Sequence, residues 1–92
     1  MPRLYKTTGS ITQMKENPSL QEMQEAVGGD IEIIHLPQSK GAFVVNSNGK
    51  HIGLAKNRNA TVVVKRMYDD KWDDTIVGNA IMLNAHELRQ ME

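Results

Sequence analysis

The chain of 92 residues contains no cysteine. This absence excludes disulfide bridges, zinc sites built from thiolates and cysteine nucleophiles, and it is the usage that a reducing compartment tolerates. Long apolar runs are also missing, since none approaches the roughly 20 residues that span a bilayer and the N-terminal stretch lacks the apolar run of a signal peptide. We therefore expect a cytoplasmic protein that is neither exported nor embedded in a membrane.

Aromatic residues make up only 4% of the chain, whereas methionine occurs 6 times. Aliphatic side chains and flexible thioethers must then fill the core of a domain near the lower end of the size that folds unaided. The chain shows no repeat, low-complexity segment or linker, so we expect residues 1–92 to form a single small domain. Because such a core is modest, we also expect a homo-oligomer.

Motifs that carry catalysis are missing as well. Neither the phosphate-loop nor the dinucleotide fingerprint appears, and the serines lie outside a nucleophile-elbow context. Three histidines, His35, His51 and His86, are far apart in the sequence, and their spacing demands no metal site. We expect a protein that is not an enzyme and that holds neither a cofactor nor a metal.

Acidic residues are absent between Glu32 and Asp69, although the whole chain has 11 basic and 11 acidic residues and a formal net charge of 0. The balanced total does not indicate a nucleic-acid binder. The distribution is more informative, because the window without acids holds Lys40, Lys50, Lys56, Arg58, Lys65 and Arg66. The middle of the chain is therefore basic.

Strand patterns recur along the first part of the chain. Residues 3–8 and 11–15 predict two strands joined by a tight turn. Residues 30–37 are apolar on both faces, which is typical of a central strand in a covered sheet.

Further strands are predicted after this run. Residues 42–46 form one strand, and Asn48-Gly49 favours a type I′ turn into a partner strand over residues 50–54. Residues 75–83 predict another strand, in which Gly78 indicates a bulge or a close backbone approach.

Cap residues predict a helix early in the chain and another at its end. The first helix begins either at an Asn17 cap or at a capping box of Ser19 with Glu22, and it ends at Gly28. The last one begins at Asn84 with a similar box.

A middle helix is predicted over residues 60–67, where apolar residues recur at helical spacing after Asn59 as the cap. Three consecutive valines keep a strand open as the alternative, because β-branched residues lose rotamer freedom in helices. Together the elements predict an α+β domain. We expect a mostly antiparallel sheet of five or six strands with two or three short helices on one face.

Short motifs rich in glycine and asparagine are spread between Ile11 and Leu83. They are Val27-Gly28-Gly29, Ile31-Glu32-Ile33-Ile34, Asn46-Ser47-Asn48-Gly49-Lys50, Gly53-Leu54, Asn57-Arg58-Asn59-Ala60-Thr61 and Ile76-Val77-Gly78-Asn79-Ala80. In this order they resemble the small phage- and bacteria-borne family catalogued as domain of unknown function 3846. The resemblance implies a genomic setting in phages and mobile elements, and it implies no activity and no catalytic residue.

The stretch leading into the middle helix has the features of a binding site. A helix that begins near Asn59 directs free backbone N–H groups at its N-terminus, where Lys56 and Arg58 add positive charge, and this combination suits a phosphate or carboxylate. Asn57 and Asn59 can add hydrogen bonds. We therefore predict ligand contacts by Lys56, Asn57, Arg58, Asn59 and Thr61. The simpler interpretation is that Asn59 is only a cap and the cations only a solvated face.

An acidic run from Asp69 to Asp74 surrounds the single tryptophan. It lacks the alternating carboxylates and central glycine of a calcium loop. Trp72 either covers the edge of the core or contacts a partner, with Asp70 and Asp73 beside it.

These features predict a non-catalytic binding protein of a phage or mobile element, with an accessory or counter-defence role in the host bacterial cytoplasm. Its expected ligand is an anionic, nucleotide-like small molecule. One alternative is an inhibitor that occludes a host enzyme through the Trp72 loop. Another is a small DNA- or RNA-binding protein that uses the basic window.

Overall fold

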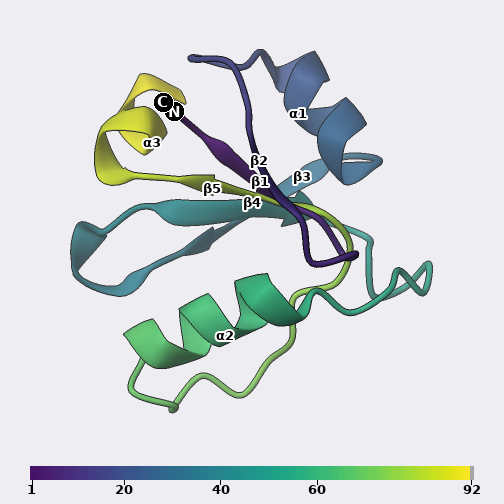
Figure 1. Ribbon diagram of the computed structural model, residues 1–92, viewed down its shortest axis with the longest axis vertical. Helices are drawn as coiled ribbons and strands as arrows, with labels where there is room; N and C mark the ends of the chain where they lie inside the picture. The colour runs from purple at the N-terminus through teal and green to yellow at the C-terminus, as the bar shows by residue number, and fades with distance from the viewer. Residues whose placement is uncertain (92) are drawn as a thin grey trace.

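A five-stranded sheet with helices on both faces makes up the computed structural model, which describes residues 1–91 (Figure 1). In chain order the strands are β1 (Arg3–Tyr5), β2 (Ile11–Gln13), β3 (Ile31–His35), β4 (Ala42–Asn46) and β5 (Ala80–Leu83). The helices are α1 (Leu20–Val27), α2 (Arg58–Met67) and α3 (Ala85–Met91), and a short 3-10 turn, η1 (Pro37–Ser39), precedes β4. Within residues 1–91, no helix has both the length and the apolar composition that crossing a membrane requires.

The last strand of the chain occupies the middle of the sheet. The strand order is β2-β1-β5-β4-β3, and every neighbouring pair is antiparallel. The β1–β2 pair thus lies on one side of β5 and the β3–β4 pair on the other, so the last strand in the sequence joins the two pairs into one sheet. The predicted α+β class with an antiparallel five-stranded sheet is confirmed.

The helices are divided between the two faces of the sheet rather than gathered on one face as expected. All five residues of β4 are buried, so other elements must pack on both faces of the sheet at this strand. Val44 packs with Val27 of α1 in one cluster, the α1-side core, whereas Phe43 and Val45 pack with Val64 of α2 in the other, the α2-side core. Figure 1 shows α2 on one side of the sheet and both α1 and α3 on the other.

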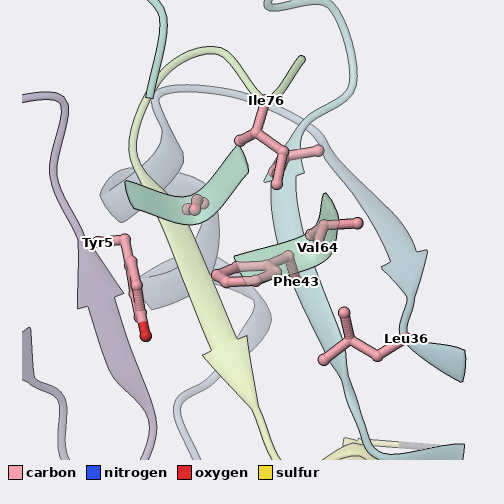
Figure 2. Packing of buried hydrophobic residues seen from close by; sticks show 8 residues of the cluster. Tyr5, Leu36, Phe43, Val64 and Ile76 are labelled. Atoms are coloured by element: carbon pink, nitrogen blue, oxygen red, sulfur yellow. The ribbon is translucent and has the colours of Figure 1, made fainter. Parts of the chain in front are cut away.

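Two aromatic rings lie at the centre of the α2-side core. The Tyr5 and Phe43 rings meet edge to face, with their centroids 5.2 Å apart and an angle of 87° between their planes. Leu36, Val64 and Ile76 belong to the same cluster around them (Figure 2). This ring arrangement adds about 0.5–1.5 kcal/mol to the stability that burial of the two side chains provides.

β3 lies at an edge of the sheet, so the prediction of a central strand is wrong. Its residues pair with β4 alone. The run is apolar on both faces because Ile31 packs against the α1-side core and Ile34 against the α2-side core. Covered faces, rather than neighbours on both edges, explain the sequence pattern.

The hairpin expected after β4 does not form. Residues 47–54 instead make consecutive turns, in which the amides of Ile52 and Leu54 donate to the oxygens of Asn48 and Gly49 at 3.0 and 2.9 Å. The reason lies in the sheet: β3 and β5 already occupy both sides of β4, so no hydrogen-bonding edge is left for a returning strand.

Cap residues fix where the helices begin and end. The Ser19 hydroxyl accepts from the Glu22 amide at 3.1 Å, and the Glu22 carboxylate accepts from the Ser19 amide at 2.8 Å, so α1 begins with the capping box. Gly28 ends it with a φ of 84°. The middle segment is a helix, which removes the strand alternative, but its cap is Asn57 and not Asn59.

Candidate anion-binding site

A hollow of about 460 Å³ lies beside α2, and three of its lining residues are cations. This surface, which we call the basic hollow, is lined by Lys56, Arg58, Thr61, Val62, Lys65 and Thr75. The lining contains no carboxylate, so the three positive charges are not offset within it.

The helix α2 supplies four of the six lining residues. They are Arg58, Thr61, Val62 and Lys65, at i, i+3, i+4 and i+7, a spacing that places their side chains on the same side of a helix. Lys56 precedes the helix, and its backbone forms an isolated antiparallel bridge with Val77. The cations therefore stand on regular backbone rather than on a free loop.

The N-terminus of α2 adds to the positive potential near Arg58. The side-chain oxygen of Asn57 accepts from the Ala60 amide at 3.2 Å and so satisfies one free N–H group of the first turn. The amides of Arg58 and Asn59 have no acceptor within the helix. No acidic residue lies in this turn, and the helix dipole favours an anion there.

Asn57 is a structural residue rather than the expected ligand contact. Its side chain is fully buried, and its amide nitrogen donates to the Tyr5 and Gly78 oxygens at 2.8 and 2.9 Å. With its oxygen used by the cap, the side chain has no group left for a ligand.

The two remaining predicted residues are also engaged. Thr61 lines the basic hollow, but its hydroxyl donates to the Asn57 oxygen at 2.7 Å and accepts from the Ile76 amide at 2.9 Å. Asn59 is exposed, lies outside the lining and donates to the Gly9 oxygen at 3.1 Å, in the turn between β1 and β2. Both side chains thus already bond to other parts of the protein, and neither offers a free donor to an anion in the basic hollow.

The structure brings Lys56 and Arg58 together as predicted, and it adds residues that the sequence-based prediction omitted. Val62 and Lys65 lie on the same side of α2 as Arg58, because α2 already begins at Arg58. The predicted helix began only after Asn59, so Arg58 was not counted in its spacing and these two residues were not grouped with it. Thr75 enters from a segment ten residues beyond Lys65, and no local pattern marks it.

Lys50, another cation of the acid-free window, has an acidic partner outside the hollow. Its ammonium group pairs with the Asp74 carboxylate. That ammonium, followed by the Thr75 amide at 2.7 Å, holds the pKa of Asp74 below its ordinary value. The charge of Lys50 is thus offset, whereas among residues 1–91 no ion pair involves Lys56, Arg58 or Lys65.

The acidic loop folds over the α2-side core. Trp72 is half-buried and packs against that core, which matches the core-cover interpretation. Asp70 and Asp73 are exposed, and the Asp70 amide donates to the Lys65 oxygen at 2.8 Å where α2 ends. Contact of this loop with a partner protein stays a prediction.

The three histidines remain apart in the fold. His35 lies on β3, His51 in the turns after β4 and His86 in α3, and all three are exposed. Within the described part of the chain, no three histidine, aspartate or glutamate side chains are grouped so that they could hold a metal ion.

Comparison with known proteins gives one match. Residues 3–90 match the model of a family described as domain of unknown function, DUF3846, which agrees with the resemblance seen in the glycine and asparagine motifs. No curated protein and no solved structure matches the chain.

Proposed function

We propose that this protein, which belongs to the domain of unknown function family DUF3846, is a non-catalytic binding protein that captures an anionic, nucleotide-like ligand in the basic hollow. The observation that carries the proposal is the meeting of Lys56, Arg58 and Lys65 in a hollow without a carboxylate. From the resemblance to phage- and bacteria-borne proteins, we further propose an accessory or counter-defence role in the cytoplasm of a bacterial host.

The chemistry of the lining favours a phosphate group. An arginine side chain can donate two parallel hydrogen bonds to phosphate oxygens, and a lysine adds a compact charge. Arg58 also stands at a helix N-terminus, which favours negative charge.

Val62 favours a ligand that also has an apolar part. Its side chain is 44% exposed and lies between Arg58 and Lys65 on the same helix face. A base or sugar can cover this apolar surface while the cations hold the phosphate, which is the usual division of labour in small-molecule sites. This supports a nucleotide-like molecule over a bare inorganic anion.

Calorimetric titration of the full chain with a panel of nucleotides and cyclic nucleotides tests the proposal. We expect one of them to bind, and we expect Arg58→Ala and Lys65→Ala each to weaken binding by about 10- to 100-fold, because each removes a charged hydrogen bond. Arg66→Ala is the matched control, since it removes the same charge from an exposed residue of α2 that does not line the hollow. Its affinity should equal that of the wild type.

Two outcomes would contradict the proposal. One is that no nucleotide binds. The other is that Arg66→Ala weakens binding as much as Arg58→Ala, which would indicate a diffuse attraction to the basic window. If duplex DNA or RNA binds instead, with an affinity that falls steeply as salt rises, the nucleic-acid alternative replaces the small ligand.

A further inference from the structure

β3 has the composition of an interior strand, yet it lies at an edge of the sheet. Three of its five residues are isoleucine, and it contains neither proline nor lysine. Its register with β4 runs without a bulge from Ile31 to His35. Proline, lysine and β-bulges are the features with which proteins often protect an edge strand from pairing. The free side of β3 is therefore open to pairing with another strand.

Hydrogen bonds at the two ends of β3 show which backbone groups point toward β4. The Asp30 oxygen accepts from the Ser47 amide at 2.8 Å, and the Leu36 amide donates to the Gly41 oxygen at 2.9 Å. Bonded and non-bonded pairs alternate along an antiparallel ladder. The even-numbered residues of β3 therefore bond to β4, and the odd-numbered ones face away from it.

Three residues consequently direct their backbone N–H and C=O groups toward the free edge: Ile31, Ile33 and His35. Within residues 1–91, the one hydrogen bond seen to these groups comes from the Tyr68 hydroxyl, which donates to the His35 oxygen at 2.8 Å. That oxygen keeps a second lone pair for another donor. Within residues 1–91, the outward groups of Ile31 and Ile33 thus have no partner, and at His35 the amide is free while the oxygen has one of its two acceptor positions left.

The opposite edge of the sheet is less suited to pairing. β2 is only three residues long, and all three are exposed. A strand this short offers few hydrogen bonds, and shortness itself protects an edge. Of the two edges, β3 has the longer and more apolar strand, and Glu32 is its only acidic residue.

We propose that β3 pairs with β3 of a second copy, antiparallel about a two-fold axis at Ile33, so that two five-stranded sheets become one continuous sheet. The outward residues are symmetric about this position, because Ile31 and His35 lie two residues to either side. Three outward residues with two groups each give six groups per copy, so this register forms six hydrogen bonds between copies. A two-fold dimer is also the commonest closed arrangement of identical chains.

The charge of Glu32 selects the same register. With Ile33 opposite its own counterpart, Glu32 stands opposite Ile34 of the second copy. A shift by two residues toward the N-terminus would instead set Glu32 opposite Glu32, and like charges directly opposite each other destabilise a sheet. The self-pairing centred on Ile33 avoids this clash and keeps the largest number of hydrogen bonds.

Sedimentation equilibrium of the full chain tests the pairing, with Ile33→Pro as the disrupting variant. Proline removes the outward N–H group and the isoleucine side chain of this residue, and it leaves the bonds between β3 and β4 in place, as edge strands tolerate. We expect a wild-type dimer, and a dissociation constant raised by about 30-fold or more in Ile33→Pro, because each copy loses one hydrogen bond. Ile33→Ala is the matched control: it loses the same apolar side chain, keeps the N–H group and stays dimeric.

Amide hydrogen exchange provides a test that needs no variant. In concentrated wild-type protein the amides of Ile31, Ile33 and His35 should exchange slowly, and on dilution they should exchange fast while those of Glu32 and Ile34 stay protected. A wild-type chain that is monomeric at all concentrations overturns the proposal. A dimer in which the odd-numbered amides of β3 exchange fast also overturns it. The same holds if the Ile33→Pro variant is folded and still dimerises as tightly as the wild type. The basic hollow shares no residue with β3, so a failure of nucleotide binding would not affect this result.

Discussion

Asn57 joins three parts of the chain that are far apart in sequence. Its side-chain nitrogen donates to the oxygens of Tyr5 in β1 and Gly78 before β5, while its side-chain oxygen caps α2 at Ala60. Its backbone amide donates to the Ile76 oxygen at 2.8 Å. Because the side chain is fully buried, water cannot replace any of these partners.

Asn57→Ala should therefore lower the free energy of unfolding by about 3–5 kcal/mol, since it removes two buried hydrogen bonds to backbone oxygens and a helix cap. Urea denaturation measures this change. Asn59→Ala is the matched control, because Asn59 is exposed and makes a single side-chain bond, to Gly9; we expect it to cost at most about 1 kcal/mol. Equal losses in the two variants would contradict the role assigned to Asn57.

The sequence predicted an asparagine cap for α2 but not the correct one. Asn57 and Asn59 both precede the apolar periodic run, and asparagine is a good cap at either position. The choice depends on the oxygens of Tyr5 and Gly78, which the sheet brings from 52 and 21 residues away. The spacing of residues near Asn57 cannot predict contacts with such distant segments. The predicted site accordingly included a buried asparagine and omitted Lys65.

At the scale of elements, the capping box makes the start of α1 sensitive to pH. The Glu22 carboxylate accepts from the Ser19 backbone amide and also pairs with Lys15 at 3.0 Å. That amide, and after it the Lys15 ammonium, hold the pKa of Glu22 below its ordinary value. Since the folded-state pKa is the lower one, the stabilisation is complete above the unfolded-state pKa and is lost as the pH falls through the folded-state pKa.

Glu22→Gln should therefore be less stable than the wild type at neutral pH, and the difference should fade in acid, between about pH 5 and pH 3. Urea denaturation at a series of pH values measures it. Glu25→Gln is the matched control, because it removes the same charge from the same helix at a carboxylate that accepts from the Gln21 side chain and takes no part in the capping box. A Glu22→Gln difference that stays constant from neutral pH into acid would contradict the pKa direction.

Helices were predictable here because their determinants are local, whereas the order of the strands was not. Ser19, Glu22 and Gly28 mark the ends of α1 within a few residues, and the structure confirms them. The neighbours of a strand depend on distant segments. β5 enters between β1 and β4 from the end of the chain, and this entry moves β3 to an edge and leaves no edge for a strand after β4.

At the scale of the whole molecule, one sheet serves two cores. β4 contributes Phe43 to the α2-side core and Val44 to the α1-side core, and β5 likewise contributes Ala80 to the first and Ile81 to the second. Disruption of either core therefore displaces the strands β4 and β5 on which the other core packs. A domain of this size is expected to unfold as a single cooperative unit.

Val27→Ala tests this coupling, because Val27 is 3% exposed in the α1-side core while Trp72 packs on the opposite face of the sheet. We expect the variant to lose about 2 kcal/mol of stability, as two buried methyl groups are removed. Tryptophan fluorescence and far-UV circular dichroism should then shift to the same lower urea midpoint, although Trp72 contacts none of the deleted atoms. Val62→Ala, which alters a 44% exposed side chain, should leave both midpoints nearly unchanged. If Trp72 kept its wild-type transition while circular dichroism moved, the layers would unfold separately, and the shared strands would not couple them.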